Sequence, residues 1–82
     1  MNEKTDEELI KDIQRGNILA FEEIVKRYQK RLFFFVYHIT QDEKDAEEII
    51  MDTLFNIYRT IERIDINRKF STYIFEIAKT LL

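Results

Sequence analysis

Residues that interrupt helices are almost absent from this chain, whose 82 residues include one glycine and no proline. Proline and glycine mark most tight turns, and sheets built from hairpins need such turns at short intervals. Their scarcity favours long helices joined by short connections. Hydrophobic residues make up 45% of the chain, enough to form one core in a single small domain. The sequence therefore predicts an all-α fold, a compact bundle of four helices with the fourth truncated by the chain end.

Capping signals place the boundaries of the first two helices. Thr5 and Glu8 fit a capping box, in which each side chain accepts a hydrogen bond from the other residue's backbone N–H. The first helix is predicted to end near Arg15, because Gly16 suits a left-handed stop. Asn17 is the expected cap of the second helix, predicted over residues 18–40.

Apolar spacing of three and four residues marks the faces that these helices bury. On the second helix the predicted stripe is Phe21, Ile24, Val25, Tyr28, Leu32, Phe35, Val36 and Ile39. Asp42 is the expected cap of a third helix over residues 43–63, with a stripe of Ala46, Ile49, Ile50, Thr53, Leu54, Ile57 and Ile61. The fourth helix is predicted to start at residue 70 or 71 and to run to the chain end.

Three aromatic residues lie off the stripe of the second helix, namely Phe33, Phe34 and Tyr37. One interpretation is that two neighbouring helices bury this wide apolar arc. The other is a sticky patch for a partner or for self-association.

Net charge is −3, which by itself disfavours nucleic-acid binding. The balance changes along the chain, because residues 63–82 hold four Lys or Arg and two Asp or Glu. Only this last quarter has the sign that a phosphate backbone favours. The chain has no cysteine, and it has no apolar run long enough to cross a bilayer. We expect a soluble cytoplasmic protein without membrane insertion.

Chemical groups that converge on a reaction centre are not evident. The one histidine, His38, is more typical of a solvated or core residue than of a ligand. Glu47, Glu48 and Asp52 share a helix, but the Glu-x-x-His motifs of a di-metal bundle are missing, as is a glycine-rich phosphate loop. We expect no enzyme activity, no catalytic residue, no metal and no cofactor.

Two surfaces remain as candidates for recognition. On the third helix the buried stripe leaves Glu48, Met51, Asp52 and Phe55 outside, with Tyr58 and Arg59 at the edge. This surface is either a solvated face or a helix-docking face whose apolar centre and acidic rim select a basic partner. The second surface interleaves basic and aromatic residues: Lys69, Phe70, Tyr73, Phe75 and Lys79. Such a pattern suits single-stranded nucleic acid, although spacing alone favours core packing.

Several segments, in this order and spacing, resemble the promoter-melting domain (conserved region two) of bacterial RNA polymerase sigma factors, most closely the extracytoplasmic-function class. They are residues 6–10 (DEELI), residues 14–17 (QRGN), Ala20-Phe21, Tyr28, residues 45–50 (DAEEII) and residues 69–73 (KFSTY). The resemblance covers nearly the whole chain. It implies a transcription initiation factor module that binds core RNA polymerase and helps to recognise and melt the promoter minus-ten element.

The resemblance also implies which residues contact the polymerase. The third helix of the family grips the clamp helices, a coiled coil of the largest polymerase subunit. The positions that match here are Glu48, Met51, Asp52, Phe55 and Tyr58. The family usually has glutamine at Met51 and glutamate at Asp52.

By the same resemblance, the start of the fourth helix captures a base flipped from the non-template strand. Tyr73 matches the aromatic residue that stacks on this base, where the family commonly has tryptophan. The neighbouring positions expected to contact DNA are Arg68, Lys69, Phe70, Ser71 and Thr72.

The resemblance implies that residues 1–82 form region two, truncated at the C-terminus, without the second DNA-binding domain. An anti-sigma factor is a further possible partner. The alternative to this function is a helical protein–protein interaction module unrelated to transcription, which docks through the Met51/Phe55 face.

Overall fold

Polar side chains set the ends of the first helix. The computed structural model describes residues 3–82, and α1 spans Asp6–Gln14. The predicted capping box is confirmed: the Thr5 hydroxyl accepts from the Glu8 N–H at 3.1 Å, and the Glu8 carboxylate accepts from the Thr5 N–H at 2.8 Å. The hydrogen bond from the Thr5 backbone lowers the pKa of Glu8. After α1 the chain turns at Gly16, whose φ of 108° favours glycine.

The second helix begins two residues later than predicted, since α2 spans Ala20–Thr40. Its N-cap is Leu19, which makes no side-chain capping bond. The expected capping role of Asn17 is therefore wrong; its backbone carbonyl instead accepts from the N–H of Ala20. Backbone bonds of a tight turn replace the side-chain cap. At the other end, Gln41 adopts a left-handed conformation with φ of 58° and stops the helix.

The third helix is shorter than predicted. α3 spans Glu43–Arg59 and starts at the expected cap, where the Asp42 carboxylate accepts from the Asp45 N–H at 2.9 Å. The α-helix ends before residue 63, at the C-cap Thr60, whose φ of −104° and ψ of 13° depart from α-helical values. The Thr60 hydroxyl donates to the Asn56 carbonyl at 2.8 Å. A 3-10 helix, η1, follows over Ile61–Arg63, and α4 spans Phe70–Leu81.

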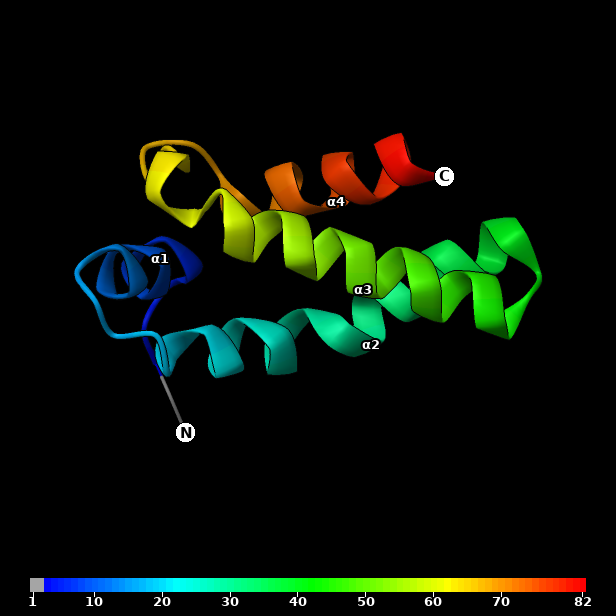
Figure 1. Cartoon of the computed structure of the whole chain (residues 1–82), viewed down its shortest axis with the longest axis horizontal. Helices are drawn as coiled ribbons and strands as arrows, with labels where there is room; N and C mark the ends of the chain where they lie inside the picture. The colour runs from blue at the N-terminus through cyan, green and yellow to red at the C-terminus, as the bar shows by residue number, and fades with distance from the viewer. Residues whose placement is uncertain (1–2) are drawn as a thin grey trace.

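The predicted all-α architecture is confirmed over the described residues (Figure 1). α2 and α3 form an antiparallel hairpin along the long axis, and α4 lies against α3. α1 packs across one end of the hairpin, next to η1. This arrangement brings α1 to the connection between α3 and α4, far from it in sequence.

The core follows the predicted stripes, of which several members are only half-buried and one is exposed. Its fully buried members include Ile24, Tyr28, Leu32, Val36, Ala46, Thr53, Ile57 and Ile74. Ile39 was expected in the stripe but is 53% exposed, because it lies in the last turn of α2, beyond the cover of α4. Leu54 is only partly buried at the edge of the core.

Tyr28 joins three helices. Its hydroxyl donates to the Asp6 carboxylate on α1, and its ring meets the edge of the Phe70 ring at 5.6 Å between centroids. Burial raises the pKa of the Tyr28 hydroxyl, so the group stays a proton donor. The Arg31 guanidinium lies 4.8 Å from the ring centroid. These contacts fix α1 and the start of α4 on α2.

The apolar arc at the end of α2 is only partly covered. Phe33 and Phe35 pack against the core, but Phe34 and Tyr37 are exposed. Phe33 stacks on Tyr37 with ring planes 10° apart. Burial of the entire arc between two helices, one of the two interpretations above, is therefore wrong for Phe34 and Tyr37.

Candidate functional site

Apolar and acidic side chains are exposed next to one another along one side of α3. Met51 is 71% exposed, Phe55 61% and Tyr58 44%. Glu48 and Asp52 are exposed on the same helix, one turn apart. These five residues, named here the α3 face, lie opposite the buried Ala46, Ile50, Thr53 and Ile57. The structure thus places all five predicted polymerase-contact residues on accessible surface.

Residues at the edge of the α3 face contact neighbouring side chains, whereas Met51 and Phe55 at its centre are exposed. The Tyr58 ring meets the Phe21 ring of α2 edge-on at 5.4 Å between centroids. Arg59 donates to the Asn56 side chain at 3.0 Å. Within residues 3–82 the carboxylates of Glu48 and Asp52 form no ion pair. The two acids are therefore available to a basic partner.

A small pocket lies where the connection after η1 meets the start of α4. Its volume is about 120 Å³, and its lining residues are Arg63, Ile64, Asp65, Arg68, Phe70 and Tyr73. We call it the loop pocket. Tyr73 also lines a wider hollow between α3 and α4, so its half-buried ring lies between the loop pocket and this hollow. An aromatic wall next to a cavity of this kind suits a flat, unpaired ring.

Positive charge gathers around the loop pocket. Arg63, Arg68 and Lys69 are exposed and form no ion pair within the described part of the chain. The Asp65 side chain is engaged locally, accepting from the Asn67 N–H at 2.9 Å. Cations beside an aromatic pocket are the combination that tracks phosphates while a base stacks.

The predicted DNA-contact residues do not all reach the surface. Arg68 and Tyr73 line the loop pocket; Lys69 and Thr72 are exposed, and Ser71 is half-buried. Phe70 is only 2% exposed, because its ring packs on Tyr28 beneath the pocket. Phe70 still lines the pocket, but its buried ring leaves little surface for the predicted contact with DNA. The DNA-contact roles of all six residues remain predictions.

Three residues near the pocket were missed by sequence reasoning. Arg63 was placed at the end of a longer third helix, although its charge was counted in the basic segment. Gln14 and Glu7 of α1 carry no local signal, because their partners lie far away in sequence. Gln14 donates to the carbonyls of Ile61 and Ile64 at 2.8 and 3.0 Å, and Glu7 accepts from the Phe70 N–H at 2.7 Å.

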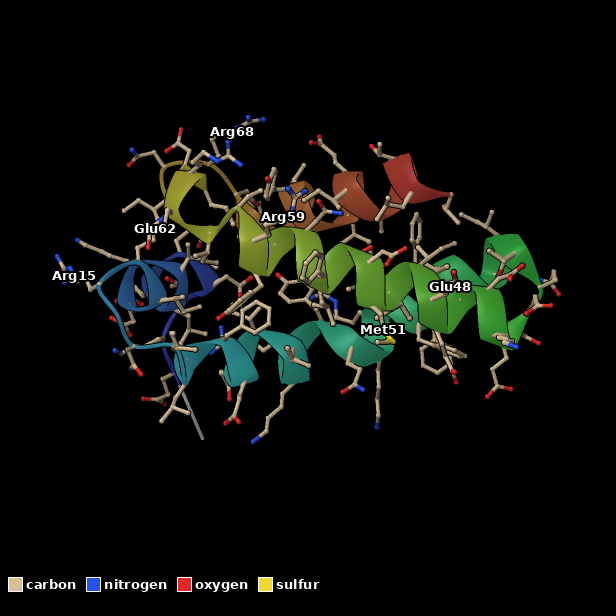
Figure 2. The ribbon with its side chains drawn as sticks, in the orientation of Figure 1. Arg15, Glu48, Met51, Arg59, Glu62 and Arg68 are labelled. Carbon is tan, nitrogen blue, oxygen red and sulfur yellow. The ribbon has the colours of Figure 1, made fainter. Side chains whose placement is uncertain are left out.

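The two surfaces lie on different sides of the domain (Figure 2). Arg68 points outward from the connection before α4, whereas Met51 lies on the side of α3 next to α2. Among residues 3–82, no group of three side chains is arranged to hold a metal ion. No helix in the same range is long and apolar enough to cross a membrane. Fold and surfaces together define a small helical module with two separate candidate surfaces for recognition.

Comparison with known sequences identifies the family. The sequence model of sigma-70 region 2 matches residues 24–82, and the chain belongs to this family. It is 35% identical over 72 residues to the ECF RNA polymerase sigma factor SigW of Bacillus subtilis. It is 23% identical over 78 residues to the RNA polymerase sigma-H factor of Pseudomonas aeruginosa. The matched segments cover 88 and 95% of this chain but only 38 and 40% of those proteins.

A solved structure shows the same fold. It is an NMR structure of an engineered region 2 of sigmaE in complex with GTAAAA. The TM-score is 0.87 at 33% sequence identity, over 99% of this chain and 85% of the other. The predicted resemblance to a sigma factor is thereby confirmed at the level of family and fold.

Proposed function

We propose that this chain is a transcription initiation module that binds core RNA polymerase through the α3 face and melts the promoter through the loop pocket. The single observation that carries the proposal is an aromatic pocket flanked by unpaired cations in a sigma-70 region 2 domain. The sigmaE neighbour, which shares the fold, is in complex with GTAAAA. Family membership favours this function over an interaction module unrelated to transcription.

The proposed polymerase partner is the clamp coiled coil of the largest subunit. Met51 and Phe55 stand one helical turn apart and are well exposed, so they offer an apolar ridge to a second helix. Glu48 and Asp52 give this ridge an acidic rim that steers basic side chains of the partner. Tyr58 extends the contact toward α2.

The proposed DNA partner is the non-template single strand of the minus-ten element. A base that leaves the duplex loses stacking and pairing, and the Tyr73 ring offsets part of that cost. Arg63, Arg68 and Lys69 approach the phosphates on either side of the pocket. The module recruits and positions without covalent chemistry. Its proposed compartment is the cytoplasm, with an anti-sigma factor as a further partner.

The α3 face is tested by two single variants of the natural protein that carries this chain. Asp52→Lys and Phe55→Ala are each expected to weaken binding to the clamp coiled coil about tenfold or more, as expected for central interface residues. Asp52→Lys should also change the salt dependence. Binding is measured by fluorescence anisotropy over a salt series.

Glu22→Lys and Phe34→Ala are the matched controls, because they make the same chemical changes at exposed positions of α2. Circular dichroism checks that all four variants stay helical. Parent-like affinity of both α3 variants contradicts the assignment of this face.

The cations of the loop pocket are tested by salt titration. Arg68→Ala and Lys69→Ala should each lower the salt slope of DNA binding by about one, because each removes one phosphate contact. The measurement uses the polymerase-bound protein and a duplex with a premelted GTAAAA segment. Lys26→Ala on α2 is the charge-matched control. An unchanged slope in both loop variants places the phosphates elsewhere.

A further inference from the structure

We propose that α1 sets the shape of the loop pocket, with Gln14 and Glu7 acting as positioning residues for strand capture. This inference rests on the proposed function of that pocket. It concerns a helix that precedes residues 24–82, the part matched by the family model. Neither side chain lines the pocket, so both act through the backbone that they hold.

Gln14 fixes the start of the pocket-forming segment. Its side-chain amide donates both hydrogens, one to the Ile61 carbonyl at 2.8 Å and one to the Ile64 carbonyl at 3.0 Å. Ile61 begins η1, and Ile64 lines the pocket. One partly buried group therefore links the end of the 3-10 helix to the pocket wall.

Glu7 fixes the other end of the segment. Lys69, the N-cap residue of α4, makes no side-chain capping bond. The Glu7 carboxylate instead accepts from the Phe70 N–H at 2.7 Å, and so caps α4 from a different helix. A carboxylate at this position also suits the positive end of the helix dipole. Phe70 lines the pocket and Tyr73 follows one turn later, so the capping bond sets where α4 presents its aromatic ring.

Between these two anchors the segment is held mainly by local bonds. The Arg68 N–H donates to the Asp65 carbonyl at 3.2 Å, and the Asn67 N–H donates to the Asp65 side chain. Residues 65 and 67–69 are exposed, and Ile66 between them packs half-buried against the core. The position of the segment relative to Tyr73 therefore depends on this one apolar contact and on the two ends that α1 holds.

The test compares Gln14→Met and Glu7→Ala in the natural protein bound to core polymerase. Gln14→Met keeps the length of the side chain and removes both donors; Glu7→Ala removes the acceptor. The amides of Ile64, Arg68 and Phe70 should exchange about fivefold faster or more, the factor for one lost hydrogen bond. Open-complex formation, read by permanganate reactivity of unpaired thymines, should also fall about fivefold or more relative to closed-complex recruitment.

Two further variants separate positioning from general stability. Glu7→Gln keeps an acceptor oxygen but loses the charge, so in both measurements it should lie closer to the parent than Glu7→Ala does. Ile10→Val loosens the core side of α1, where Ile10 is fully buried, without touching the segment. It should lower thermal stability and leave the ratio of open to closed complex unchanged.

The outcomes separate this inference from the function on which it rests. If Gln14→Met and Glu7→Ala match Ile10→Val in both measurements while Tyr73→Ala blocks opening, α1 does not position the pocket and the proposed function stands. If Tyr73→Ala also opens promoters as the parent does, the proposed role of the pocket fails together with this inference.

Discussion

Replacing Tyr73 by alanine is expected to block promoter opening while leaving recruitment of the polymerase to the promoter nearly intact. The ring of Tyr73 forms one wall of the loop pocket and is half-buried there. Each base stacked on an aromatic residue contributes about 1–3 kcal/mol, a factor of roughly 5 to 160 in the opening equilibrium. The α3 face is formed by another helix, so polymerase binding should not change.

Permanganate reactivity of unpaired thymines measures this effect, with closed-complex formation followed in parallel by mobility shift. Tyr73→Trp is the informative control, because it keeps an aromatic surface and should open promoters. Phe75→Ala is a second control: it removes a half-buried aromatic residue of the same helix that does not line the pocket. Normal opening by Tyr73→Ala would make Tyr73 a packing residue, the role that spacing alone favours.

Truncation of Ile57 to alanine is expected to cost the domain about 2–5 kcal/mol of unfolding free energy. Ile57 is fully buried in the last turn of α3, a helix with α2 and α4 packed against it. A domain of this size loses at least about 8 °C of melting temperature for such a change. Since folded domains have only about 5–15 kcal/mol in total, the loss is severe.

Leu54 provides the contrast that tests the assignment of the buried face. Its side chain is partly buried at the edge of the core, so Leu54→Ala should cost only about 1 kcal/mol. Phe55→Ala, on the exposed side, should stay within about 0.5 kcal/mol of the parent. Chemical denaturation followed by circular dichroism gives all three values. Equal losses at Ile57 and Leu54 would mean that α3 is rotated about its axis relative to this structure.

Local rules were sufficient to predict most of the helices. The Thr5–Glu8 capping box, the left-handed Gly16 and the Asp42 cap are all present, because each depends on residues within three or four positions. The buried faces follow from the same short spacing. The errors are at helix ends: Asn17 does not cap α2, because backbone bonds of the turn take the place of a side-chain cap, and α3 ends at Thr60, before residue 63.

The candidate site was less predictable because it is assembled from distant parts of the chain. Exposure of Met51 and Phe55 follows from the pattern on α3, and the structure agrees. Whether Phe70 or Tyr73 faces outward does not follow from the pattern, because both residues fit an apolar helical stripe. Contact with Tyr28 on α2 buries Phe70. The anchors Gln14 and Glu7 bond to backbone groups, which leave no trace in side-chain patterns.

The long-range bonds of α1 have a consequence for the order in which the domain folds. Gln14 and Glu7 meet partners 47, 50 and 63 positions away, whereas α2 and α3 are joined by a two-residue turn. The entropic cost of closing a loop rises with its length, so the α2–α3 hairpin is the easier contact to form. α1 leaves the ribosome before the other helices, but the N–H group from which Glu7 accepts exists only after residue 70 has been synthesised. The surface proposed to bind polymerase thus takes shape early, and the part proposed to read DNA is completed last.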